Sequence, residues 1–182
     1  MFLLIVGIAL WVLAHLFKRL APEARAKMGD RGKGPVALLI LAGVVLMVIG
    51  YRMTDDAAYL WDPPYWLRHV NNLLVLIAIF LMSPAPKKGR LLNGMRHPML
   101  TGFALWAFAH LLVNGDVAAI TMFGAFLVWA LVEMALINRA EPAWTPPEPG
   151  SYAKDGMFLV GSVILMGVIG YIHGLLGYPV FG

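Results

Sequence analysis

The sequence contains no cysteine. Disulfide bonds, thiolate catalysis and thiolate metal ligands are therefore excluded. The five histidines become the main candidate ligands for a metal or a haem, whereas the eleven methionines are better explained as flexible packing in an apolar core.

Charged residues are scarce: they make up 13% of the chain, against 60% hydrophobic residues and a mean hydropathy of +0.77. A soluble domain is roughly 45–50% apolar and about 25% charged. A chain of 182 residues cannot bury this excess in one core, so lipid is the expected solvent. We expect a single integral membrane domain over residues 1–182. The net charge of +4 does not indicate nucleic-acid binding, because in a membrane protein the positions of the charges matter more than their sum.

Several motifs of soluble enzymes are also missing. The sequence has no GxSxG elbow, no GxxxxGK[ST] loop and no HExxH helix. No apolar segment carries paired carboxylates, since Glu133 stands alone. An ionisable residue inside a membrane is costly, so Glu133 is expected to face the bundle and to pair with a donor such as Arg68, Arg96 or an amide.

What the sequence does contain is a series of long apolar runs. In lipid a helix satisfies its own backbone hydrogen bonds, so each run predicts a membrane-spanning helix. The fold class is therefore predicted to be all-α, a polytopic transmembrane bundle of about six spans. The runs are residues 2–17, 35–51, 70–82, 98–113, 117–137 and 157–178.

The loops between these runs predict the orientation. Twelve of the 14 Lys and Arg residues lie in alternate loops, in residues 18–33, 87–96 and 139–154. The positive-inside rule places these loops in the cytoplasm, and both termini outside it. The opposite loop, residues 51–69, is rich in Trp and Tyr. It is interpreted as an interfacial aromatic belt, or alternatively as a lid over a cavity that opens outward.

Two histidines end apolar helical faces. His110 follows Phe103 and Trp106 at helical spacing, and His15 follows Ile8 and Trp11 in the same way. Such a face suits a bulky planar cofactor with an axial imidazole. It also suits a packed helix whose histidine bonds to a backbone carbonyl, and the residues alone leave both interpretations open.

The segment RHPMLTGFALWAFAHLLVNGD, residues 96–116, resembles the NnrU family of bacterial membrane proteins. AHLF in the first run and LWDPPYWLRH before the third support the resemblance, which covers nearly the whole chain. NnrU proteins are associated with bacterial nitrite and nitric oxide reduction, that is with denitrification. The family is similar to the plastid zeta-carotene isomerase, a multi-span enzyme that uses haem b to isomerise a cis double bond in a polyene.

This resemblance implies haem b as the cofactor and a location in the bacterial inner membrane. The isomerase's ligand positions correspond here to His15 and His110, and its redox-linked cysteine corresponds to Ala107, which has no thiol. A depth comparison along the helices matches His110 better with His173, so His173 and His69 are reserve ligands. The residues expected at the cofactor are His15, His110, Arg96, His97 and Trp106. Arg96 and His97 would meet a propionate, or would serve as a simple interfacial anchor.

The leading functional expectation is a haem-binding membrane protein, either isomerase-like on a lipophilic polyene or a redox component linked to nitrite and nitric oxide reduction. The rival is a non-catalytic accessory protein that supports assembly of membrane nitrogen-oxide reductases. A third interpretation comes from RHPMLTG, which also looks like the RHPxYxG of S-adenosylmethionine-dependent membrane methyltransferases. Leu100 replaces its tyrosine and the downstream Glu-Glu pair is missing, so this interpretation ranks last.

Overall fold

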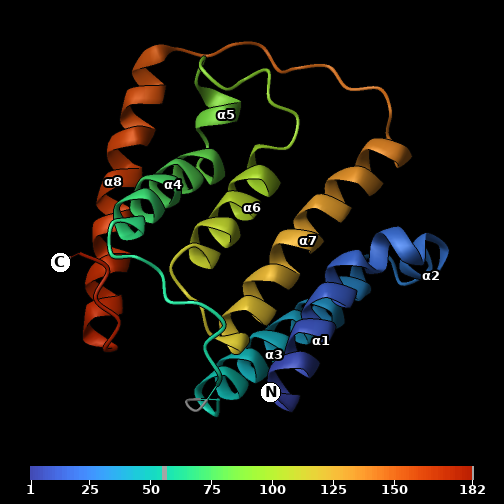
Figure 1. Ribbon diagram of the computed structural model, residues 1–182. Helices are drawn as coiled ribbons and strands as arrows, with labels where there is room; N and C mark the ends of the chain where they lie inside the picture. Colours follow the sequence, from blue (N-terminus) through green and yellow to red (C-terminus); the bar gives the residue numbers. More distant parts are fainter. Residues whose placement is uncertain (55–56, 182) are drawn as a thin grey trace.

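The computed structural model describes residues 1–54 and 57–181, and in these ranges the chain forms helices and no β-strand (Figure 1). This confirms the predicted all-α class. Three short turns, α2 (Pro22–Lys27), a 3-10 turn (Gly29–Gly32) and α5 (Ala85–Lys88), occupy the connections. The longer helices are α1 (Phe2–Leu20), α3 (Lys33–Arg52), α4 (Leu67–Met82), α6 (Pro98–Leu111), α7 (Val117–Ala140) and α8 (Tyr152–Leu175).

All six predicted runs are helical, but they differ in length. Four helical segments in the described ranges are long and apolar enough to cross a membrane, namely α1, α7, α8 and the stretch Gly29–Arg52 that contains α3. The other two are shorter, with 16 residues in α4 and 14 in α6. At about 1.5 Å per residue these two reach roughly 24 and 21 Å, less than the ~30 Å of a hydrocarbon core.

The longer helices pack in the order α3, α1, α7, α6, α4 and α8, with α8 at one edge (Figure 1). Helices that are far apart in the chain can therefore be neighbours in space: α1 packs against α7 as well as against α3. Among the longer helices α8 packs mainly against α4, and most of its surface is exposed. The apolar outer face of α8 is thus available to lipid.

Glycines let α1 and α3 approach closely. A Cβ placed on Gly7 would lie 2.6 Å from the backbone nitrogen of Met47, and one on Gly43 would lie 2.9 Å from the carbonyl oxygen of Gly7. Gly50 meets the backbone of Leu4 in the same way. Small residues at such a crossing allow two backbones to pack directly, which is how helices associate where lipid supplies no hydrophobic drive between them.

The buried core lies between α1, α6 and α7, with one contribution from α3. Aromatic rings fill much of it. Trp11 stacks on Phe103 with centroids 5.7 Å apart, and it meets Trp129 edge-on at 4.6 Å. Aromatic pairs in these geometries add to the burial of their area.

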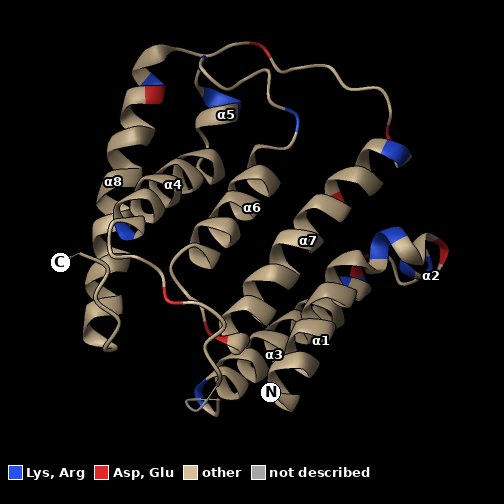
Figure 2. Ribbon diagram, viewed as in Figure 1, with Lys and Arg blue, Asp and Glu red and all other residues tan. Residues whose placement is uncertain are grey.

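Charge separates the two ends of the bundle. Lys and Arg gather at the end where α1, α4 and α7 finish and α6 and α8 begin, which we call the basic end (Figure 2). The connection from α7 to α8, residues 141–150, crosses this end without helical structure, within the loop 139–154 that the sequence predicted. The opposite end, which we call the aromatic end, carries the loop before α4. That loop is bonded to the start of α7, since Leu60 N donates to Gly115 O (2.8 Å) and Val117 N donates to Ala58 O (3.0 Å).

Candidate functional site

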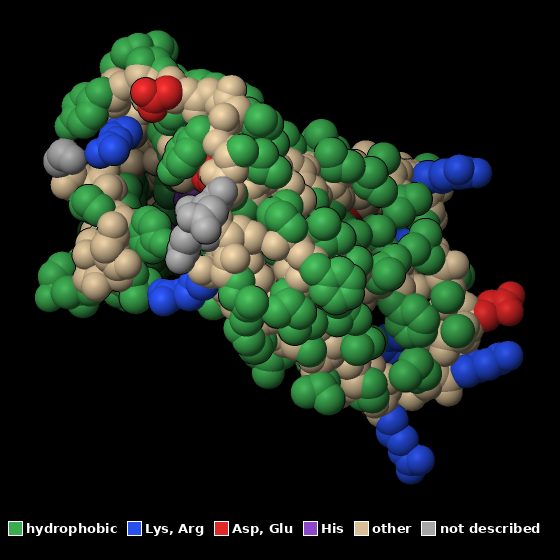
Figure 3. Space-filling view, turned by 60° about the horizontal axis from the view of Figure 1, so that its bottom comes forward, with side chains coloured by type: hydrophobic (Ala, Val, Ile, Leu, Met, Phe, Trp, Pro, Cys, Tyr) green, Lys and Arg blue, Asp and Glu red, His purple; other side chains and the backbone are tan. Residues whose placement is uncertain are grey.

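A cavity of about 590 Å³ lies between α4, α6 and α8. The segment that follows α8, residues 177–180, completes its wall. Figure 3, a view toward the aromatic end, shows this side of the molecule hollowed, with a histidine side chain visible inside. The volume falls within the roughly 300–1,000 Å³ typical of ligand sites. The lining is mainly apolar, with Val75, Ile79, Met82, Phe103, Trp106 and Met166 among its residues.

Three histidines share one local geometry. The Nδ1 of His15, of His110 and of His173 each lies 2.8 Å from the carbonyl oxygen four residues earlier in its helix. Because a carbonyl only accepts, Nδ1 carries the hydrogen in each pair. In the neutral imidazole the lone pair then lies on Nε2, and a fixed Nδ1–H contact is the arrangement that orients a histidine as an iron or metal ligand.

Two of these histidines line the same cavity. His110 lines it from the last turn of α6 and His173 from the last turn of α8, with Trp106 one turn before His110. The predicted site residues His110 and Trp106 are therefore brought together, and the reserve ligand His173 joins them. The other reserve, His69, is exposed at the start of α4, beside the ring of Tyr65 at 5.8 Å.

His15 lies elsewhere, at the interface of α1 and α7. Its ring is 4.0 Å from that of Trp11 and 5.1 Å from that of Trp129, measured between centroids. Rings connect it to the cavity: Trp11 contacts Phe103, Phe103 contacts Trp106 at 5.2 Å, and Trp106 contacts His110 at 4.9 Å. The structure therefore places His15 and His110 at the two ends of an aromatic row and does not bring them together.

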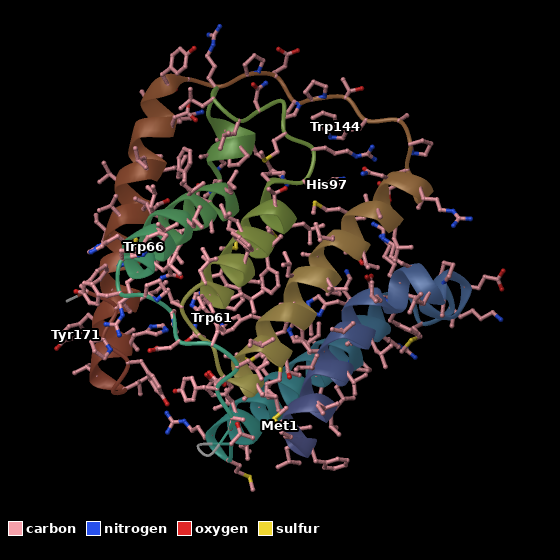
Figure 4. All side chains as sticks on the ribbon, in the orientation of Figure 1. Met1, Trp61, Trp66, His97, Trp144 and Tyr171 are labelled. Carbon is pink, nitrogen blue, oxygen red and sulfur yellow. The ribbon has the colours of Figure 1, made fainter. Side chains whose placement is uncertain are left out.

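Arg96 and His97 also lie away from the cavity, at the basic end. Figure 4 shows His97 at the start of α6 below Trp144 of the connection to α8. Arg96 donates to the carbonyl oxygens of Glu141 and Pro142, and His97 Nε2 lies 2.8 Å from Asn138 Oδ1. These bonds tie the start of α6 to the end of α7.

The structure adds polar residues that the predicted site did not include. Arg68, Asn71, Asn72 and Asn114 line the cavity near the aromatic end. The two adjacent amides within an apolar run were the visible signal in the sequence. The backbone carbonyl of Val180 fixes the orientation of both side-chain amides. Asn72 Nδ2 donates to Val180 O (3.1 Å), and Asn71 Nδ2 in turn donates to Asn72 Oδ1 (3.0 Å). This chain of bonds holds the segment after α8 against α4.

A second, smaller cavity of about 230 Å³ adjoins the first at the aromatic end. Pro63 and Pro64 of the loop before α4 line it. Tyr59, Asp62 and Asp116 give it a polar wall, and Arg68, Val113 and Asn114 belong to both cavities. The predicted loop, residues 51–69, includes residues 55 and 56, which lie outside the described residues.

Glu133 finds a partner other than the expected ones. Its Oε1 lies 3.5 Å from Nε of Arg19, the last-turn arginine of α1, and Arg19 Nη1 donates to Oε1 of Glu141 at 3.1 Å. The expectation of Arg68 or Arg96 was wrong, because α1 and α7 run side by side in the same direction and finish together at the basic end. The hydrogen bond and charge of Arg19 hold the pKa of the Glu141 carboxyl below its usual value of 4.5.

Within residues 1–54 and 57–181, no three His, Asp or Glu side chains lie close enough together to hold a metal ion by themselves. A haem iron needs only one or two axial donors, because the porphyrin supplies the other four. The cavity offers two imidazoles on a mainly apolar wall, so its residues fit a haem better than a bare ion.

The sequence model of the family described as "NnrU protein" matches residues 3–180 of the chain. Neither a comparison with curated proteins nor one with solved structures gave a match.

Proposed function

The chain belongs to the NnrU family, and we propose that it is a haem-binding membrane protein whose cofactor site is the cavity between α4, α6 and α8. One observation carries the proposal: His110 and His173, from two different helices, line the same cavity, each with Nδ1 fixed on a backbone carbonyl. In this proposal His110 is the first axial ligand.

The second ligand distinguishes two versions of the proposal. The family resemblance favours His15, whereas the cavity favours His173, which already faces the same space as His110. For His15 to ligate, the row of Trp11, Phe103 and Trp106 would have to open. We therefore propose His173 as the partner and keep His15 as the competing prediction.

The remaining residues shape and close the site. Phe103 and Trp106 offer flat apolar contact from α6, and Met166 and Ile169 offer it from α8. Ala107 is fully buried in the core, so no thiol accompanies His110 at that position. A bound haem would supply a redox-active iron, and with both imidazoles in place a small gas such as nitric oxide would bind it only after one of them had left.

We also propose that all six longer helices cross the bacterial inner membrane, with both termini outside the cytoplasm. The charge separation supports this orientation, because the basic end would face the cytoplasm. The short helices α4 and α6 can be matched by local thinning of the bilayer. A chain without cysteine permits a direct test by single-cysteine labelling. Cysteines at Arg90 and Lys154 should be protected from an impermeant reagent in intact cells, and one at Asp62 should be labelled. The reverse pattern at any of these sites would overturn the orientation.

The cofactor is tested on detergent-purified protein expressed with haem in excess. We expect near-stoichiometric haem with a Soret band in the wild type. His110→Ala should abolish or shift this band, because it removes the first ligand. His173→Ala should convert six-coordinate haem to five-coordinate, whereas His15→Ala should leave the spectrum unchanged.

The matched control is His69→Ala, which removes an exposed imidazole outside the cavity and should alter nothing. A change caused by His15→Ala but not by His173→Ala would replace His173 by His15 in the proposal. Wild-type protein that purifies colourless and takes up no added haem would overturn haem binding, and its co-purification with a nitrogen-oxide reductase would favour the accessory role.

A further inference from the structure

Arg68 occupies the wall between the two cavities. It lies in the first turn of α4, and its side chain lines both the cavity of about 590 Å³ and the smaller one of about 230 Å³. It is the one arginine among the described residues that line the larger cavity, which contains no Lys, Asp or Glu. An arginine in this position can offer its guanidinium to a ligand that enters from the aromatic end.

The larger cavity is graded in polarity along α4. Arg68, Asn71 and Asn72 line it at the start of the helix, and Ile79 and Met82 line it at the finish. From Arg68 to Met82 the helix rises about 21 Å at ~1.5 Å per residue. The start of a helix also favours negative charge, through its free N–H groups and the helix dipole. One end of the cavity therefore suits an anion, and the other end suits an apolar body.

The guanidinium of Arg68 is held by an aromatic ring, and no carboxylate within residues 1–54 and 57–181 forms an ion pair with it. It lies over the ring of Tyr65, with Cζ 5.3 Å from the centroid. Of the two carboxylates that line the smaller cavity, Asp116 uses Oδ1 to cap α7 through Ala119 N at 2.8 Å, and Asp62 is exposed on the loop. Arg68 thus keeps donor capacity on the side of the larger cavity.

We propose that the cavity binds an anionic amphiphile and that Arg68 holds its acidic group, so that the acid points to the aromatic end and the apolar body extends toward Met82. The inference rests on the same cavity as the proposed function, and for haem it means that Arg68, rather than Arg96, meets the propionates. Arg96 is already bonded to backbone carbonyls at the basic end. A guanidinium pairs with a carboxylate through two parallel hydrogen bonds, which an ester cannot reproduce.

The test compares an acid with its ester on the full chain in detergent. The first pair of probes is haem b and its dimethyl ester, followed by absorption. Wild-type protein should bind the acid about tenfold more tightly than the ester, the size expected for a charge-assisted hydrogen bond. Arg68→Gln should lower affinity for haem b to that of the ester and leave ester binding unchanged. Arg68→Lys should restore only part of the preference. The control is Arg52→Gln, which removes the other basic residue of this end, located at the finish of α3 and outside both cavities.

A second pair of probes, oleate and methyl oleate measured by titration calorimetry, separates this inference from the haem proposal. If neither haem probe binds but oleate shows the same dependence on Arg68, the haem proposal fails and the Arg68 site stands. If haem b and its ester bind wild-type protein equally, or if Arg68→Gln weakens both equally, the Arg68 site is overturned and haem binding stands. If no probe binds, both are overturned. Circular dichroism and gel filtration establish that each variant remains folded.

Discussion

Arg19 of α1 connects Glu133 of α7 with Glu141, the residue that directly follows this helix, with its Nε 3.5 Å from Glu133 Oε1 and its Nη1 3.1 Å from Glu141 Oε1. The side chains of Arg19 and Glu133 are only 17% and 13% exposed, whereas that of Glu141 is 60% exposed. Arg19 therefore pairs with one largely buried carboxylate, that of Glu133, and with one exposed carboxylate, that of Glu141. This joins the finish of α1 to the finish of α7 at the basic end, where the two helices lie side by side (Figure 1).

Removing this arginine should destabilise the bundle. Arg19→Gln leaves the Glu133 carboxylate sheltered without its partner, and we expect a loss of about 1–3 kcal/mol in the free energy of unfolding. Thermal unfolding in detergent measures it. The control is Lys33→Gln, which breaks an exposed pair with Asp30 (side chains 73% and 92% exposed) and should cost less than about 0.5 kcal/mol. Equal losses in the two variants would show that the Arg19–Glu133 contact adds no stability.

The Arg19–Glu141 contact should depend on pH in a defined direction. Arg19 lowers the pKa of Glu141 in the folded protein, so the carboxylate's contribution is present above its usual pKa of 4.5 and is lost as pH falls through the lowered value. Glu141→Gln should unfold slightly earlier than wild type near pH 7, and this difference should shrink as the pH falls below 4.5. The measurement is the thermal midpoint of both proteins from pH 7 to below pH 4.5. A difference that grows on acidification would contradict the assignment.

The crossing of α1 and α3 should tolerate no side chain at its glycines. The side chain of Gly43→Val would clash with Gly7 and Trp11, because atoms of both residues lie about 3 Å from a Cβ atom placed on Gly43. Overpacking of this kind costs typically about 1–3 kcal/mol. Gly167→Val is the matched control, because a Cβ at Gly167 of α8 meets nothing within 4 Å. Thermal unfolding of the two variants should differ accordingly; a Gly167→Val loss as large as that of Gly43→Val would mean that general helix propensity, not the crossing, decides.

The fold was largely readable from the sequence because hydropathy acts locally. Each apolar run, from residues 2–17 to residues 157–178, became a helix, since a run of that composition has no other way to satisfy its backbone in lipid. The ends of the helices were less accurate. The last predicted run extended to residue 178, whereas α8 finishes at Leu175 and Gly177 then takes a left-handed turn (φ 91°) toward the cavity. A turn of this kind depends on tertiary contacts such as Asn72 with Val180.

The site was only partly readable, because it depends on which helices are neighbours. The apolar face that ends at His110 was visible from spacing alone, and it does line a cavity. The depth comparison did point to His173, but spacing could not show which helices surround the cavity, since the packing order α3, α1, α7, α6, α4 and α8 brings α8 and α4 to α6 and leaves α1 on the other side of the core. For the same reason Arg19 rather than Arg68 or Arg96 reaches Glu133. The local periodicity of the sequence contains no information about the order in which the helices pack.

A buried carboxylate should hold α8 in place at the basic end. Asp155, 3% exposed in the first turn of α8, accepts through Oδ2 from Arg90 N (2.8 Å) and Leu91 N (3.2 Å) in the loop between α5 and α6. Asp155→Ala removes the charged acceptor of both N–H groups, and we expect a loss of about 1.5–3 kcal/mol, the contribution typical of hydrogen bonds to a charged group. We expect the effect to be local, because α8 packs mainly on α4 and is linked to α7 only by the non-helical residues 141–150.

The measurement that isolates this anchor is limited proteolysis of residues 141–150 in detergent, together with the thermal midpoint. Asp155→Ala should be cut several-fold faster than wild type, since release of α8 frees the connection for the protease. Asp155→Asn retains an acceptor oxygen and should fall between the two. Asp30→Ala, which removes an exposed carboxylate far from α8 in the chain, is the control and should leave the cutting rate unchanged. If Asp155→Ala behaved like Asp30→Ala, α8 would be held by its contact with α4 alone, and the cavity wall would not depend on the carboxylate at its far end.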